Sequence, residues 1–239
     1  MYTSKLRQTQ KRYLAKVLIF LGKNVVNAYK AQRREQMRYE ALIRDTLVEN
    51  TIHLIAEGGF EKATTRAITH DGFIPPEVKL NEVYIYRIFG GKEELYSEAF
   101  RCLDCELINE LNKDIDEFCH SSNSIKQNFK ILFDHLWRFV LRNEDHCRCY
   151  VRYYYSVYYK GASQKMHHQF FDQIVKRLTP IFKPEADVKS LLHSVFTTLL
   201  DFAIRVYNGD IPDNQDSADH IFNVLYLSIS SYFKQELVK

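Results

Sequence analysis

The sequence predicts an all-α protein of two domains, preceded by an additional helix. Three observations predict this class. The 239 residues include only five prolines and eight glycines, so few positions interrupt a helix. Apolar residues recur at spacings of three and four through most of the chain, and no segment alternates between turn signals as a strand would. The composition, 46% hydrophobic and 26% charged, is ordinary for a globular protein.

Residues 1–39 predict a basic amphipathic helix, running from Lys5 to near Arg34 without a proline. At about 100° per residue, basic and apolar side chains fall on opposite faces. The basic face holds Lys5, Arg12, Lys16, Lys23, Lys30 and Arg34, and the apolar face holds Leu14, Leu18, Leu21, Val25, Ala28 and Tyr29. Three interpretations are open: packing on the body or on a partner subunit, contact with DNA phosphates, or binding to a membrane surface.

Residues 40–101 have the layout of a helix-turn-helix domain that reads DNA. A first helix spans Glu40 to Glu57, and Gly58-Gly59 ends it. Thr64 is the predicted N-cap of the second helix, and its hydroxyl at that helix start is placed to hold a phosphate. Asn81 is the predicted cap of the third helix.

Base contacts would come from the exposed start of the third helix, at Asn81, Glu82 and Tyr84. Asparagine pairs with adenine and glutamate accepts from cytosine N4, although the charge of Glu82 opposes general DNA binding. Residues 1–44 carry eleven Lys and Arg against two acidic residues, a net charge of +9, whereas residues 102–239 carry −2. Phosphate binding requires such a concentration of positive charge. The predicted contact residues therefore also include Arg34 and Arg38. Thr65, next to the cap of the second helix, is predicted as a contact residue as well.

Three segments of this domain resemble the N-terminal domain of TetR-family transcriptional regulators. They are LIAEGGF at residues 54–60, ATTRAI at 63–68 and, most specifically, IYRIFGGKEEL at 85–95. The resemblance implies that Tyr86 and Lys92 contact the DNA backbone. It also implies a C-terminal domain, residues 102–239, that binds a ligand and forms dimers.

One departure from the family pattern lies between the second and third helices. Roughly six extra residues, Ile74 to Lys79, include two prolines and therefore form a loop. The loop adjoins the surface that would enter the major groove. It is either a tolerated surface insertion or a change that alters docking and removes base readout.

Beyond residue 101 the pattern predicts a series of helices. Their ranges are 103–118, 124–141, 149–159, 163–182, 186–208 and 216–233. The last two resemble the helices through which the family forms homodimers as a four-helix bundle. A dimer would place two recognition helices about one DNA turn apart, or a multiple of it, on a pseudo-palindromic operator.

The segment from Tyr150 to Tyr159 contains six tyrosines in ten residues. Either these tyrosines fill the core and an interface, or they line an aromatic pocket for a small-molecule effector. The candidate pocket residues are His135, Trp137, Phe139, Arg152, Tyr153, Tyr154 and His193.

Motifs for other chemistry are lacking. The sequence has no Gly-rich phosphate loop, no HExxH and no serine elbow, so we expect no enzyme and no cofactor. Cys102-x-x-Cys105 and Cys147-x-Cys149 are interpreted as structural thiols, with a metal or redox site as the alternative, and no metal is predicted. No secretory signal or membrane span is predicted, so we expect a cytoplasmic protein with reduced cysteines.

These observations predict a dimeric DNA-binding regulator, a repressor that an effector in the C-terminal domain releases. The alternative is a protein–protein interaction module with the same fold, in which the enlarged turn and Glu82 have abolished specific DNA binding.

Overall fold

The computed structural model describes the backbone of residues 2–120 and 123–234, and the side chains of residues 30–115, 118 and 123–234. Its regular elements in these ranges are α-helices and one 3-10 helix, which confirms the predicted class. They are α1 (Tyr2–Gly58), α2 (Thr65–His70), α3 (Val83–Phe89), α4 (Lys92–His120), α5 (Ile125–Arg142), α6 (Glu144–Tyr154), α7 (Gly161–Leu178), η1 (Thr179–Ile181), α8 (Val188–Tyr207) and α9 (Gln215–Ser230).

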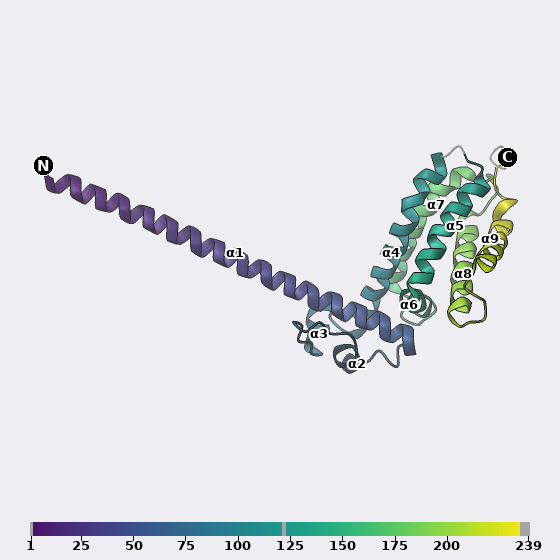
Figure 1. The fold of residues 1–239 in the computed structure, drawn as a ribbon, viewed down its shortest axis with the longest axis horizontal. Helices are drawn as coiled ribbons and strands as arrows, with labels where there is room; N and C mark the ends of the chain where they lie inside the picture. Colours follow the sequence, from purple (N-terminus) through teal and green to yellow (C-terminus); the bar gives the residue numbers. More distant parts are fainter. Residues whose placement is uncertain (1, 121–122, 235–239) are drawn as a thin grey trace.

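The predicted N-terminal helix and the first helix of the helix-turn-helix are one continuous helix, α1 (Figure 1). No glycine or proline lies between Lys23 and Glu57, so nothing in this stretch ends a helix. The two predicted domain boundaries, at 39/40 and 101/102, therefore lie inside α1 and α4. The division into domains stays a prediction about function.

The N-terminal part of α1 projects away from the rest of the molecule (Figure 1). Every side chain from Lys30 to Arg38 is exposed, whereas from Ile43 onward the helix contributes to the core. The amphipathic faces predicted for residues 5–29 lie outside the described side chains. Within residues 30–38, α1 presents cations to solvent and does not pack on the body.

The helix-turn-helix unit comprises the end of α1 with α2 and α3. Gly59 ends α1 with a φ of 76°, a left-handed conformation that glycine adopts without steric cost. The hydroxyl of Thr64 accepts from the backbone N–H of Ala67 over 3.1 Å, so Thr64 is the N-cap of α2, as predicted. Gly90, with a φ of 93°, ends α3 and separates it from α4.

Helices α4 to α9 form the body, and α4 joins it to the helix-turn-helix unit (Figure 1). Ser124 and Gln127 form a capping box at the start of α5. Helix α6 lies against α1, while α8 and α9 pack on each other and on α5 at the far side of the body (Figure 1). One buried hydrophobic cluster runs from Ile43 in α1 to Phe233 after α9, so the two parts share a core.

The tyrosine segment departs from its predicted helix. Helix α6 ends at Tyr154, and residues 155–160 form a turn. The hydroxyl of Ser156 donates to the carbonyl of Tyr153 over 2.7 Å and accepts from the N–H of Tyr158 over 3.1 Å. Such local bonds compete with a continuing helix. Tyr150, Tyr153 and Tyr154 therefore lie in α6, whereas Tyr155, Tyr158 and Tyr159 lie in the turn that follows it.

Candidate DNA-binding surface and cavities

The start of α3 is fixed by side chains of the preceding segment. The hydroxyl of Thr65 donates to the carboxylate of Glu82, which is half-buried. The predicted cap is corrected: Glu82, not Asn81, is the N-cap residue of α3. The amide oxygen of Asn81 instead accepts from the N–H of Val83 over 3.0 Å, because Asn81 lies in the turn before the helix.

The inserted loop between α2 and α3 is anchored to α1. Val78 is buried, and the N–H of Lys79 donates to the hydroxyl of Tyr39 over 3.3 Å. Gly72 lies so close to Asn50 that an added Cβ would stand 2.1 Å from the amide carbon of that side chain. Asn50 in turn donates to the carbonyl of Ile68 over 3.0 Å. The loop therefore has a defined position, and it leaves Phe73 80% exposed.

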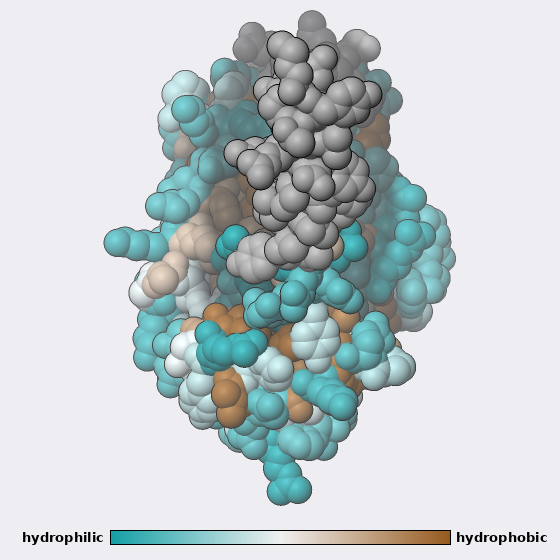
Figure 2. Space-filling view, turned by 90° about the vertical axis from the view of Figure 1, so that its left-hand side faces the viewer, coloured by the Kyte–Doolittle hydropathy of each residue, from teal (hydrophilic) through white to brown (hydrophobic). Residues whose placement is uncertain are grey.

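Helix α3 keeps an exposed outer face. Val83 is 67% exposed and Tyr86 58%, and Asn81 at the start of the helix is also exposed. The guanidinium of Arg87 lies 4.6 Å from the ring centroid of Tyr84, which is half-buried. The insertion does not cover these outward side chains. In Figure 2, hydrophilic side chains are interleaved with apolar ones on the face below the grey helix.

Helix α1 brings positive charge to the side of α3. Arg87 of α3 lies 3.9 Å from the carboxylate of Glu40 in α1. Along α1, the exposed Arg38 lies about half a turn from Glu40, and the exposed Arg34 lies between about one and a half and two turns from it. The half-buried Lys92 at the start of α4 has its ammonium 5.7 Å from the ring centroid of Tyr96.

Sequence analysis missed several exposed basic side chains of this unit. They are Arg66, His70, Lys79 and Arg87. Arg66 and Arg87 lie inside the quoted family-like segments, so their position could have indicated a role. Nothing in the local pattern singled out His70 or Lys79.

The body is bonded to the helix-turn-helix unit through α6 and α4. Arg152 donates to the carbonyl of Ile55 over 2.8 Å, and His53 is 2.7 Å from Asp145. The hydroxyl of Tyr96 donates to the carbonyl of Ala63 over 2.5 Å. A movement of α6 would therefore act directly on the last turns of α1.

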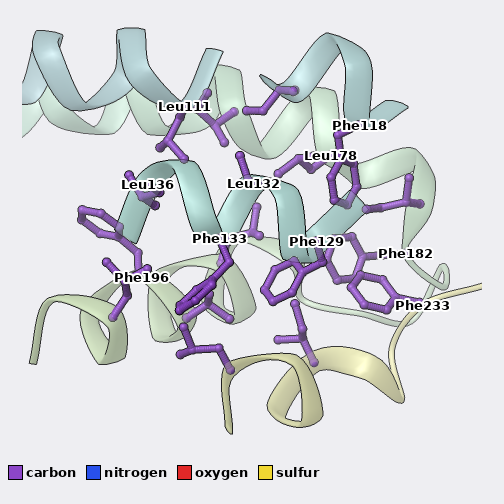
Figure 3. Close-up of a pocket in the computed structure, with 18 of the residues that line it drawn as sticks. Leu111, Phe118, Phe129, Leu132, Phe133, Leu136, Leu178, Phe182, Phe196 and Phe233 are labelled. Atoms are coloured by element: carbon purple, nitrogen blue, oxygen red, sulfur yellow. The ribbon is translucent and has the colours of Figure 1, made fainter. Parts of the chain in front are cut away.

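A cavity of about 80 Å³ lies among α4, α5, α7, α8 and α9. Every side chain that lines it is a hydrocarbon, so we term it the apolar cavity. In Figure 3, Phe196 lies at one end, Phe182 and Phe233 lie at the opposite end, and Phe133 lies between them.

A second cavity, of about 170 Å³, lies among α6, α7 and α8, and we term it the tyrosine–histidine cavity. It is lined by Tyr150, Tyr154, Tyr155, His167 and His193 together with residues of α8. Two of the predicted pocket residues, Tyr154 and His193, are among them. Burial, and then the nearby His167, lowers the pKa of His193.

The other five predicted pocket residues have different surroundings. Arg152 binds the end of α1, and His135 pairs with Asp114 over 2.8 Å. Trp137 is buried and stacks on Phe133, and Phe139 lines a smaller third cavity of about 30 Å³. Tyr153 is buried, stacks on Phe100 and donates to the carbonyl of Tyr158 over 3.1 Å. These residues serve the core and the junction between the two parts.

Behind the tyrosine–histidine cavity lies a buried polar cluster that sequence analysis missed. The carboxylate of Asp104 is fully buried, and its Oδ1 is 3.0 Å from His167 Nδ1 and 3.4 Å from the hydroxyl of Tyr150. Its Oδ2 has no hydrogen-bond partner among the described residues. Burial, and then Asp104, raises the pKa of Tyr150 well above its ordinary value.

The described cysteines, Cys102, Cys105, Cys147 and Cys149, are free thiols. Burial raises the pKa of Cys147 to about 12, which keeps this thiol protonated and unreactive. The described residues contain no group of three or more side chains suited to hold a metal ion. Cys119 lies outside the described side chains.

Crossing a membrane would need a longer or more apolar helix than any that the described residues form.

The chain has the fold of TetR-family transcription regulators. A TetR-family regulator of Marinobacter aquaeolei VT8 matches it with a TM-score of 0.64 at 16% sequence identity, covering 82% of this chain and 97% of the other. A putative TetR-family regulator of Shewanella sp. PV-4 matches with a TM-score of 0.63 at 13% sequence identity, covering 80% of this chain and 98% of the other. The fatty acid degradation regulator FadR of Bacillus halodurans matches with a TM-score of 0.56 at 14% identity, covering 77% and 97%.

Sequence comparisons identify no relative: no family model matches the chain, and no curated protein does. The likeness to the solved structures is therefore one of fold.

Proposed function

We propose that this chain is a TetR-type transcriptional regulator, a repressor that binds double-stranded DNA as a homodimer and is released by a small-molecule effector. The observation that carries the proposal is the exposed face of α3 beside the cations of α1. Asn81, Val83 and Tyr86 are exposed there, and Arg87 of α3 lies 3.9 Å from Glu40 of α1, the helix that carries the exposed Arg34 and Arg38. Such a regulator acts where the DNA is, so we propose a cytoplasmic location.

The side chains of this surface fit two separate tasks. The amide of Asn81 pairs with adenine, and Val83 meets a thymine methyl group in the major groove. Thr64, Tyr86 and Lys92 hold phosphates, which positions the domain without reading the sequence. The Thr65–Glu82 hydrogen bond holds the start of α3 and fixes the carboxylate of Glu82 against α2, while its negative charge remains.

Dimerisation through α8 and α9 completes the proposal. Helix α9 exposes Leu227 by 70% and Val224 by 37%, which is apolar surface that a partner copy would cover. A two-fold dimer then presents two α3 helices to a pseudo-palindromic operator, with half-sites about 34–36 Å apart or a multiple of it.

An effector in the body would act through α6. Tyr150 and Tyr154 of this helix line the tyrosine–histidine cavity, and Arg152 of the same helix binds the last turn of α1. A ligand that favours one position of α6 changes the separation of the two reading heads, and DNA affinity changes with it.

An interaction module with the same fold is the second candidate. Two observations favour it: the insertion beside α3, and the projecting part of α1, which would be available to a protein partner. In that case α3 would bind every DNA weakly and equally.

The test measures DNA binding by fluorescence anisotropy and gel shift, using DNA from around the chain's own gene, random DNA as competitor and a range of salt concentrations. We expect specific binding that falls steeply with salt. The double variant Tyr86→Phe with Lys92→Ala should weaken binding on all sequences and flatten the salt slope by about 1. Lys165→Ala, at an exposed site on α7, is the control.

Weak and equal binding to all DNAs would favour the interaction module. Binding that the double variant leaves unchanged would overturn the assignment of Tyr86 and Lys92.

A further inference from the structure

The apolar cavity and the tyrosine–histidine cavity are neighbours. Phe196 of α8 lines both of them, and its ring packs edge-on against Tyr150 at a centroid distance of 5.9 Å. In Figure 3 Phe196 lies at the end of the apolar cavity, far from Phe182 and Phe233. Phe196 is therefore part of the wall of both spaces.

The apolar cavity accepts hydrocarbon alone. It offers no hydrogen-bond donor or acceptor from any lining side chain, and a water molecule needs two to four polar partners. A polar head group would lose its hydration there without compensation. This compartment therefore suits an alkyl chain.

The tyrosine–histidine cavity has a different chemistry. Tyr150, Tyr154 and Tyr155 contribute aromatic rings to it, and Asp201 contributes a carboxylate. None of the described residues that line it is Lys or Arg. Tyr155 is 72% exposed and Asp201 is exposed, so a ligand reaches this cavity from solvent.

The charge of the ligand follows from the charges around this cavity. Burial raises the pKa of Tyr150 and of Tyr154, so both stay neutral, and burial lowers the pKa of His193. His167 lies 3.0 Å from the carboxylate of Asp104. Among the described residues that line the cavity, Asp201 supplies a carboxylate, and no Lys or Arg is present to pair with a carboxylate or phosphate of a ligand.

We propose that the effector is an organic ammonium ion with an alkyl tail. The ammonium lies among the rings of Tyr150, Tyr154 and Tyr155, since aromatic faces attract quaternary ammonium groups. The tail passes Phe196 into the apolar cavity. The inference names the effector class of the proposed function and therefore rests on it.

The test uses the full chain and three probes below their micelle concentrations: decyltrimethylammonium, decanoate with the same tail, and tetramethylammonium as the head alone. Isothermal titration calorimetry gives each Kd in the absence of DNA. We expect decyltrimethylammonium to bind at least about tenfold more tightly than either other probe.

Three variants examine the site. Tyr154→Leu should weaken decyltrimethylammonium binding by about five- to tenfold, and Asp201→Asn by a few fold, with little effect on decanoate. Asp213→Asn, in the exposed loop before α9, removes the same charge elsewhere and should change nothing. Decanoate binding as tight as the cation, or cation binding insensitive to Tyr154→Leu, would overturn the inference.

DNA affinity is then measured with and without decyltrimethylammonium. Tight cation binding by a chain that binds no specific DNA would overturn the proposed function while supporting the ligand class. Specific DNA binding without a preference for the cation would overturn the ligand class alone.

Discussion

The guanidinium of Arg152 donates a hydrogen bond to the carbonyl oxygen of Ile55 over 2.8 Å, which joins α6 to the last turn of α1. The same carbonyl also accepts from the backbone N–H of Gly59 over 2.9 Å, and the helix dipole favours a cation at the end of a helix. Val151, directly before Arg152, and Tyr154, two residues after it, line the tyrosine–histidine cavity. One short helix therefore contacts both the candidate effector site and the DNA-reading unit.

Replacing Arg152 with glutamine removes this charged donor. We expect the free energy of unfolding to fall by about 1.5–3 kcal/mol, the range for hydrogen bonds to charged groups. We also expect the effect of any ligand on DNA affinity to become smaller, because α6 and α1 are no longer bonded. Urea denaturation measures the first effect. Arg142→Gln, at an exposed site at the end of α5, is the control, and equal stability of the two variants would contradict the prediction.

Local signals predicted the helix-turn-helix unit well. The Gly58-Gly59 stop and the Thr64 cap depend on neighbouring residues, so a short window of sequence contains their cause. The cap of α3 was predicted one residue too early, since Asn81 uses its amide in the preceding turn. The continuity of α1 was missed although residues 24–57 contain no helix-ending residue, because two separate amphipathic patterns were treated as two helices.

Stability should depend on pH through His146. Hydrogen bonds to Glu106 of α4 and Glu49 of α1 raise its pKa from 6.5 to about 9. Because the pKa in the folded state is the higher one, the stabilisation is fully present below about pH 6.5 and is lost as the pH rises through about 9. The urea midpoint should therefore fall over this window.

The comparison protein for this prediction is His146→Gln, which cannot gain the charge. Its urea midpoint should fall less between about pH 6 and pH 9.5 than that of the natural chain, since the other titrating groups are common to both. If the two proteins lose the same stability over that pH window, the ion pairs of His146 do not contribute to the pH dependence of stability.

The cavities were only partly predictable, because their residues come from distant parts of the sequence. Of the predicted pocket residues, Tyr154 and His193 line the tyrosine–histidine cavity. Arg152 meets Ile55 across 97 residues of sequence, and Asp104 meets His167 across 63. No local pattern reveals such pairs. The packing of α4, α6 and α7 brings them together.

The anchoring of the inserted loop can be tested with two apolar residues of the same loop. Val78 is 5% exposed and Phe73 is 80% exposed. Val78→Ala should cost about 1–2 kcal/mol of unfolding free energy for two buried carbons and the space they leave. Phe73→Ala should stay within about 0.5 kcal/mol of the natural chain. Urea denaturation of both variants checks this, and a larger loss for Phe73→Ala would show that the loop is held differently.

Thr64 combines two roles that substitutions can separate, since its hydroxyl caps α2 and faces the proposed phosphate. Thr64→Ala removes the cap and should cost about 0.5–2 kcal/mol of stability. Thr64→Asp keeps a good cap, so stability should be unchanged, but it sets a negative charge against the DNA backbone. We expect Thr64→Asp to lower affinity for all DNA sequences by about tenfold or more.

Ser124→Asp makes the same kind of change at the cap of α5 and should leave DNA binding intact. Fluorescence anisotropy titrations compare the DNA affinities of Thr64→Asp and Ser124→Asp. Equal affinities would mean that the start of α2 does not contact the DNA backbone.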